Sequence, residues 1–258
     1  EGSPAFFAGA FDVVQATYLD EPKVAEAFRT GKGVGWHEHS KCLFSGTERF
    51  FRPGYNANLV PNWIPAFEGL DAKLKAGAKV ADVGCGHGAS TIVMAQAYPK
   101  SEFFGFDYHK PSIERAKVLA QEAGVGDRIT FAQASAKDFP AKDYDLVAFF
   151  DCLHDMGDPV GAGKHVKETL AKDGSWMIAA PLVASAETNP RSMRSMRTGP
   201  RPVLITCAPS PQTTPAPRRR TPTRDAPAAV HDPNGVRLQR VLAAAGLGSR
   251  RACEQLIE

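Results

Sequence analysis

Three glycines and two aspartates have the types and spacing expected around a small charged ligand. The run Asp82-Val-Gly-Cys-Gly-His-Gly88 follows an apolar stretch and places glycine at every second position. Glycine lets the backbone turn sharply and approach a ligand closely, and a helix that starts after the turn offers free N–H groups and a partial positive charge. Asp107 ends the next apolar stretch, where a carboxylate can accept hydrogen bonds from both hydroxyls of a ribose.

Short apolar stretches alternate with helical ones between residues 78 and 181. Strands are expected at 79–83, 102–106, 128–133, 144–150 and 175–180, with helices at 89–98, 111–122 and 161–170. This alternation predicts an α/β fold, a Rossmann-like doubly wound parallel sheet with helices on both faces. Because parallel strands end at one edge of their sheet, the glycine turn, Asp107 and Asp151 are expected to meet there.

The glycine spacing separates two classes of cofactor. Dinucleotide enzymes use G-x-G-x-x-G, which places a pyrophosphate on the helix end. The glycines at 84, 86 and 88 give G-x-G-x-G instead, preceded by Asp82. This pattern resembles the first motif of class I methyltransferases that use S-adenosylmethionine (SAM). A nicotinamide-dependent oxidoreductase is the alternative that the spacing disfavours.

The resemblance extends over residues 31–181 and narrows to bacterial methyltransferases that carry a winged-helix dimerisation region before the catalytic domain. The phrases that carry it are GKGVGW, GTERFFRPGY, VADVGCGHGAST, GFDYH and FFDCLHDMGDP. It implies SAM as the cofactor, a small-molecule methyl acceptor, and a homodimer where the N-terminal region is complete. Residues 1–28 would be the end of that region, with the winged helix itself missing.

The resemblance also assigns roles to residues. Asp82 and the glycines would line the methionine part of SAM, Asp107 and Tyr108 would hold the ribose and adenine side, and Asp151 would close the pocket near the sulfonium. The implied cofactor-binding residues are Asp82, Gly84, Gly86, Gly88, Asp107, Tyr108, Ser135, Ala136 and Asp151. The catalytic candidates are His154, as a general base for an acceptor that must lose a proton, and Asp155, as the residue that orients it.

Simpler structural roles compete with several of these assignments. Asp151 is also a plausible helix cap, and a histidine such as His154 near a helix start is often only a polar surface residue. His37 and His39 resemble a metal pair, but no third ligand follows at useful spacing, so no metal site is predicted. The aromatic residues that could form either a lid over the cofactor or part of the core are Trp36, Phe50, Phe51 and Tyr55.

The composition changes sharply near residue 182. The net charge of +3 is the sum of −4 before Val183 and +7 from Val183 onward, and no aromatic residue follows Trp176. We therefore expect a helical N-terminal and lid segment at 1–70, a SAM-binding core at 71–182, a disordered Pro/Arg-rich linker at 183–234, and a partial helical module at 235–258. The linker lacks the aromatic residues of a final hairpin, so the edge strands are expected to be missing or replaced.

The C-terminal segment resembles the opening helices of the RNA-binding module of bacterial ribosomal pseudouridine synthases. The residues that match the module's basic, RNA-facing positions are four arginines and one serine: Arg237, Arg240, Ser249, Arg250 and Arg251. This resemblance implies RNA contact through 235–258, and it supplies the alternative function: an RNA-binding fragment, or a fusion protein that acts on RNA. We also hypothesise that 183–234 is a frameshift or a join between unrelated genes, which one intact reading frame in an independent isolate would contradict.

Cysteine usage and hydropathy indicate the compartment. The five cysteines are widely spaced and include no C-x-x-C pair, which argues against a disulfide framework and fits a reducing cytoplasm. No apolar stretch is long enough to span a membrane, so no membrane association is expected. The chain starts at Glu1 without a signal peptide, and we expect its true N-terminus to be missing.

Overall fold

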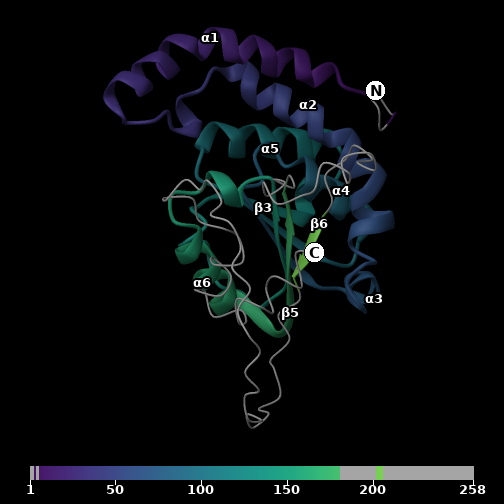
Figure 1. Ribbon diagram of the computed structural model, residues 1–258. Coiled ribbons are helices and arrows are strands. Elements are labelled where there is room, and N and C mark those ends of the chain that lie inside the picture. Colours follow the sequence, from purple (N-terminus) through teal and green to yellow (C-terminus); the bar gives the residue numbers. More distant parts are fainter. Residues whose placement is uncertain (1–2, 4–5, 181–201, 206–258) are drawn as a thin grey trace, which may run out of the picture.

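The computed structural model describes residue 3, residues 6–180 and the backbone of residues 202–205 (Figure 1). Its centre is a six-stranded sheet of order β3-β2-β1-β4-β5-β6. The strands are β1 Lys79–Val83, β2 Glu102–Asp107, β3 Ile129–Gln133, β4 Tyr144–Phe150, β5 Leu170–Ala179 and β6 Pro202–Ile205. The first five are parallel, which confirms the predicted Rossmann-like α/β fold.

The strand β6 lies within residues 183–234, for which a disordered linker with missing or replaced edge strands is expected, and it shows that four of these residues form an edge strand. It pairs antiparallel with β5, with Ala179 opposite Pro202 and Trp176 opposite Ile205. Four consecutive residues are enough for such a pairing because the edge of β5 supplies the backbone partners. Pro202 stands at the first position of this edge strand, where proline is tolerated. The rest of the expected linker and the module at 235–258 lie outside the described residues.

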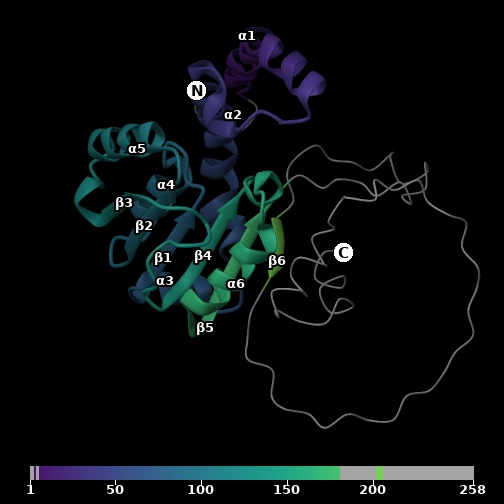
Figure 2. The same cartoon turned by 90° about the vertical axis from the view of Figure 1, so that its left-hand side faces the viewer.

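The two faces of the sheet have separate cores because successive side chains of a strand point to opposite sides. One face carries Val80 and Phe103 and is covered by α3 Leu70–Ala76, α4 Ala89–Ala97 and α5 Lys110–Glu122. The other carries Ala81 and is covered by α6 Pro159–Thr169 (Figure 2).

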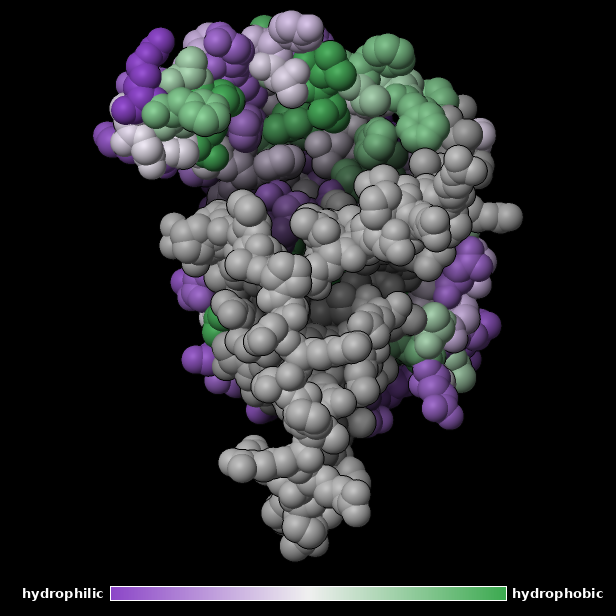
Figure 3. Space-filling model, viewed as in Figure 1, coloured by the Kyte–Doolittle hydropathy of each residue, from purple (hydrophilic) through white to green (hydrophobic). Residues whose placement is uncertain are grey.

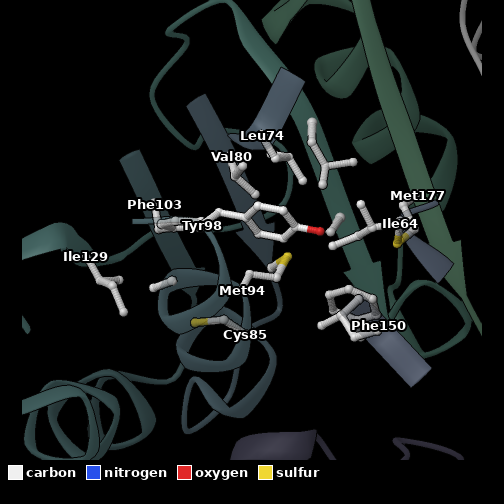
Figure 4. Close-up of a cluster of buried hydrophobic side chains, with 14 of the residues drawn as sticks. Ile64, Leu74, Val80, Cys85, Met94, Tyr98, Phe103, Ile129, Phe150 and Met177 are labelled. Atoms are coloured by element: carbon white, nitrogen blue, oxygen red, sulfur yellow. The ribbon is translucent and has the colours of Figure 1, made fainter. Parts of the chain in front are cut away.

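Tyr98 occupies the middle of the first core, with Leu74 on one side and Met94 on the other (Figure 4). Its hydroxyl donates a hydrogen bond to Asp71 Oδ1 at 3.0 Å, so the one polar atom of this buried ring is satisfied. Burial raises the pKa of this hydroxyl above its ordinary value. The phenol therefore stays protonated and acts as a donor in the core.

The N-terminal helices α1 Ala8–Thr30 and α2 Lys41–Asn58 lie together above the carboxyl end of the sheet (Figures 1 and 2). The proline at 22 suggests two helices separated by a break, but α1 continues through it. The carbonyl that Pro22 leaves without an N–H partner belongs to Tyr18, a largely exposed residue, so water can satisfy it. Packing on α2 then holds the helix together.

Two glycines allow α1 and α2 to touch backbone to backbone. A Cβ on Gly9 would lie 2.5 Å from the carbonyl oxygen of Gly46, and one on Gly46 would lie 2.9 Å from the nitrogen of Val13. An ion pair of 2.6 Å joins Asp12 to Arg49 beside this crossing. The two helices therefore form one unit, and α2 is the member that faces the sheet.

Asp20 connects the far end of α1 to the start of α2. Its buried carboxylate accepts hydrogen bonds from the backbone N–H and hydroxyl of Ser40 and from Lys23, and it contacts His39 Nδ1 at 3.0 Å. The backbone N–H of Ser40 holds the pKa of Asp20 well below its ordinary value. His39 thus serves the junction between helices, whereas His37 meets the ring of Tyr108 edge-on.

Further helical turns are Trp36–Glu38, Leu59–Trp63, Gly126–Arg128 and Leu153–Asp155. Within the described residues, no helix combines the length and apolar character needed to cross a bilayer.

Candidate functional site

The glycine turn lies at the carboxyl end of β1, beside β4, where the strand order reverses direction. This is the position at which open α/β sheets bind ligands. Gly84, Gly86 and Gly88 all have positive φ, at 75°, 52° and 77°, which an L side chain rarely adopts. The turn ends at α4, whose first N–H groups face the same edge of the sheet.

The three glycines have different surroundings. A Cβ on Gly84 would lie 2.8 Å from Cys152 Sγ, and one on Gly88 would lie 2.7 Å from the ring of Phe131. A Cβ on Gly86 would meet nothing within 4 Å. The outer two glycines are therefore required by packing, whereas the middle one faces open space in which a ligand can lie.

Asp82 is fully buried at the end of β1, directly before the turn. Its Oδ2 accepts hydrogen bonds from Ser90 Oγ at 2.6 Å and Thr91 Oγ1 at 2.7 Å, both on the first turn of α4. Its Oδ1 has no partner among the described residues. Burial raises the pKa of Asp82 to about 6, so the site holds a carboxylate that lacks a compensating cation.

Asp107 fastens the glycine turn to the end of β2. Its Oδ2 accepts the backbone N–H of Gly86 at 2.9 Å, and its Oδ1 accepts that of His109 at 2.8 Å. Burial raises its pKa above the ordinary value despite these two donors. Each oxygen keeps a second lone pair, so the carboxylate can still accept hydroxyl donors. Tyr108 beside it is partly exposed.

Asp151 adopts a strained conformation at the end of β4. Its φ is +53°, its backbone N–H donates to the carbonyl of Ala179, and its buried Oδ1 has no hydrogen-bond partner among the described residues. Burial raises the pKa of this carboxyl. Such strain persists only where the surroundings enforce it, and it gathers at functional sites. The structure thus places Asp151 beside the turn, as expected.

His154 lies one turn past Asp151 and is half exposed. Its Nδ1 is 3.9 Å from Asp151 Oδ1, and its Nε2 is 3.4 Å from Asp155 Oδ1. Neither contact is a hydrogen bond, so the ring has carboxylates on two sides and is not locked by either.

Ser135 and Ala136 follow β3 and are less closely tied to the turn. The Ser135 backbone N–H and hydroxyl both donate to Asp138 Oδ1, at 2.7 and 2.9 Å. Ala136 packs against the core of the α6 face. Gln133 Nε2 donates to the carbonyl of Tyr108, and this bond joins the segment to the Asp107 corner.

Cys85 and Cys152 flank the glycine turn as small apolar side chains. Burial raises the pKa of both thiols well above the ordinary value, so both are protonated at neutral pH. Neither is in a disulfide.

Helix α2 contributes three residues to this site, spaced one helical turn apart on one face. Glu48 contacts His87 of the turn at 3.0 Å, and Arg52 pairs with Glu48. Burial raises the pKa of Tyr55 well above its ordinary value, and the nearby charges of Asp82 and Asp151 raise this pKa further. Sequence reasoning missed Glu48, Arg52 and His87. The i, i+4, i+7 spacing in GTERFFRPGY was the signal that could have identified the helix face.

Of the four aromatic residues considered as a lid, Tyr55 lies at the site. Its ring also meets Trp63 and Phe150, and Phe51 stacks on it. Trp36 instead packs on His39 and Phe44, and Phe44 stacks on His109 at 4.5 Å between ring centres. The segment before residue 60 therefore covers both the Asp107 and the Asp151 side of the turn.

Comparison with known proteins identifies relatives of this arrangement. The family model described as "Methyltransferase domain" matches residues 74–207, more than half of the chain. The ubiquinone biosynthesis O-methyltransferase of Leptothrix cholodnii is 33% identical over 150 residues, which are 56% of this chain and 58% of that protein. The 27-O-demethylrifamycin SV methyltransferase of Amycolatopsis mediterranei is 37% identical over 132 residues, 49% and 48% of the two chains.

A solved structure shares the fold. An O-methyltransferase family protein from Burkholderia thailandensis superposes with a TM-score of 0.54 at 18% identity, over 71% of this chain and 57% of that one. The chain spans about half the length of the curated relatives it matches.

Proposed function

Because this chain belongs to the methyltransferase-domain family, we propose that it transfers a methyl group from SAM to a hydroxyl oxygen of a small molecule. The observation that carries the proposal is the pair of buried carboxylate oxygens, Asp82 Oδ1 and Asp151 Oδ1, that have no hydrogen-bond partner among the described residues and lie on either side of an open glycine turn. The names of the relatives, which are O-methyltransferases, support the acceptor class.

The residues present fit SAM as the cofactor. SAM carries an ammonium and a sulfonium, and buried carboxylate oxygens that lack a hydrogen-bond donor are complementary to such groups. We assign Asp82 and the glycines 84, 86 and 88 to the methionine part, and Asp107 and Tyr108 to the ribose and adenine side. Asp151 closes the sulfonium side, and Ser135 and Ala136 border the adenine.

When bound, SAM supplies a methyl group that is already activated by the sulfonium, so the protein chiefly orients the reactants and excludes water. We assign His154 the role of general base. Its ring would accept the proton of the acceptor hydroxyl as that oxygen takes the methyl group that bound SAM would supply. Asp155 orients the ring, and both contacts of His154 with carboxylates stabilise the imidazolium that forms.

Calorimetry with S-adenosylhomocysteine (SAH), the demethylated product of SAM, tests the cofactor assignment on the full chain. A single site with micromolar affinity is expected. A folded chain that does not bind SAH contradicts the proposal.

Replacing His154 by Gln is expected to slow methyl transfer about 100-fold, the usual contribution of a general base. SAH affinity should stay within about twofold of wild type because the ring is half exposed and outside the glycine turn. The measurement is transfer of tritiated methyl from SAM to a panel of phenols. Asp155→Asn should show a smaller loss, and Glu114→Gln, on the exposed side of α5, should show none. An unchanged rate in His154→Gln would exclude its role as a base.

We also propose that the face of α1 turned away from α2 is a dimer contact, although the resemblance implies a homodimer only where the N-terminal region is complete. Phe11, Tyr18 and Phe28 are each more than three-quarters exposed along this helix, and Figure 3 shows hydrophobic residues gathered over α1 and α2. Light scattering at about 5 and about 100 μM protein, concentrations that span moderate dimer affinities, measures the molar mass and tests this contact. We expect the dimer of the wild type to be lost in Phe11→Ser/Phe28→Ser. A wild-type monomer at both concentrations contradicts it.

A further inference from the structure

Glu48 and His87 form a buried contact between the N-terminal helices and the glycine turn. His87 Nδ1 lies 3.0 Å from Glu48 Oε2, and the side chains are 12% and 8% exposed. Arg52, one turn along α2, pairs with the other oxygen of the same carboxylate. Glu48 and Arg52 lie before residue 74, where the match to the family model begins, so membership of the family does not account for the contact.

The chemistry of the pair determines which nitrogen of His87 carries the proton. A carboxylate only accepts hydrogen bonds, so Nδ1 is the donor. Burial, with Arg115 next in importance, lowers the pKa of His87 below its ordinary value, so the ring is neutral at neutral pH. The contact is therefore a directional N–H to carboxylate hydrogen bond that needs the ring in one orientation.

A glycine turn needs such an anchor. Three glycines within five residues have many accessible backbone conformations, and ordering them costs conformational entropy. A Cβ on Gly86 would meet no atom within 4 Å, so no packing holds this residue in place. Asp107 holds it only through its backbone N–H. The first half of the turn is already fixed, because Cys85 is buried in the core and the backbone N–H groups of Gly84 and Cys85 both donate to the carbonyl of Phe106. In the second half, His87 supplies a side chain, and Glu48 fastens it.

We propose that Glu48 and His87 are positioning residues that hold the glycine turn in its cofactor-binding conformation beneath α2. The inference rests on the proposed function, since it assumes that the turn binds SAM. A turn ordered before binding does not consume binding free energy in becoming ordered, so its affinity is higher. Through this pair, α2 contributes to cofactor affinity.

The experiment measures SAH affinity of the full chain by calorimetry, with folding followed by thermal unfolding. His87→Ala removes the anchor and is expected to weaken SAH binding about tenfold. His87→Asn is expected to stay within about threefold of wild type, because its amide N–H reaches the position of Nδ1. Glu48→Ala removes the acceptor of the same hydrogen bond and is expected to weaken SAH binding to a similar extent. Glu26→Gln, at an exposed Glu–Arg pair of α1, is the matched control.

The rescue by Asn separates positioning from a general effect on folding, because both His87 variants remove the ring. SAH binding by wild type together with equal affinity in His87→Ala would overturn the inference and leave the proposed function intact. Failure of the wild type to bind SAH would instead overturn the proposed function. If His87→Ala does not fold, His87→Leu, which fills a similar volume without a donor, takes its place; failure of both to fold would show a role in stability and overturn the inference.

Discussion

Replacing Asp82 by Asn is expected to weaken SAH binding roughly 10- to 100-fold while leaving the free protein at least as stable as wild type. The carboxylate is fully buried and one oxygen has no partner among the described residues. Asn removes the charge that the cofactor ammonium would meet, and it keeps an oxygen that can accept from Ser90 and Thr91. The variant thus separates the binding role of Asp82 from its structural role.

The stability change follows from the raised pKa of Asp82. The folded value of about 6 lies above the ordinary 3.8, so ionisation opposes folding as pH rises between these values, and the full penalty applies at pH 7. This pKa shift corresponds to a penalty of roughly 3 kcal/mol on folding of the ionised wild type, which the Asn variant does not have. The amide N–H of Asn without a partner would offset part of that gain. We expect a net gain of about 1 kcal/mol in the free energy of unfolding at pH 7, measured by urea unfolding.

The same residue predicts the pH dependence of cofactor affinity. Asp82 must be ionised to meet the ammonium, so wild-type SAH affinity is expected to fall about tenfold from pH 7 to pH 5. The Asp82→Asn variant should lose this pH dependence of SAH affinity. The control variant Asp127→Asn, at an exposed position, should keep it. Asp107, whose pKa is also raised by burial, accounts for any remaining slope. A less stable Asn variant with normal SAH affinity would contradict the assignment.

The same substitution at two glycines of the turn should lower stability by different amounts. Gly88→Ala is expected to lower the free energy of unfolding by about 2–4 kcal/mol. The alanine must keep a left-handed φ, and its methyl group would lie 2.7 Å from the ring of Phe131. Gly86→Ala meets no atom within 4 Å and should cost about 1–2 kcal/mol from the left-handed φ alone.

The order reverses for ligand binding. Gly86→Ala places a methyl group in the open space at the centre of the turn, and we expect it to reduce SAH affinity more than tenfold despite its smaller effect on stability. Urea unfolding measures the stability of both variants, and calorimetry measures their SAH affinity. In the double variant Gly88→Ala/Phe131→Leu, the smaller side chain should recover about 1 kcal/mol. Equal losses of stability at Gly86 and Gly88 would contradict the role given to Phe131.

The core elements of the site were predictable because they depend on local patterns. Apolar runs followed by Gly or Asp identified β1, β2 and β4 together with Asp82, Asp107 and Asp151, and parallel pairing then brought these residues to one edge. The sequence therefore determined the α/β class, the glycine turn and the carboxylates around it. The proposed roles of those residues come from the family resemblance that this motif carries.

The tertiary structure decided the features that depend on partners distant in the chain. Helix α1 continues through Pro22 because α2 supports it, and four residues of the tail form β6 because the edge of β5 is free to pair with them. Glu48 and His87, 39 positions apart, carry no local signal of their meeting. Periodicity reports which face of an element is apolar, but it does not report which polar side chain lies opposite another across two elements. That pairing is set by how α2 packs over the end of the sheet, and it supplies the contact on which we expect the cofactor turn to depend.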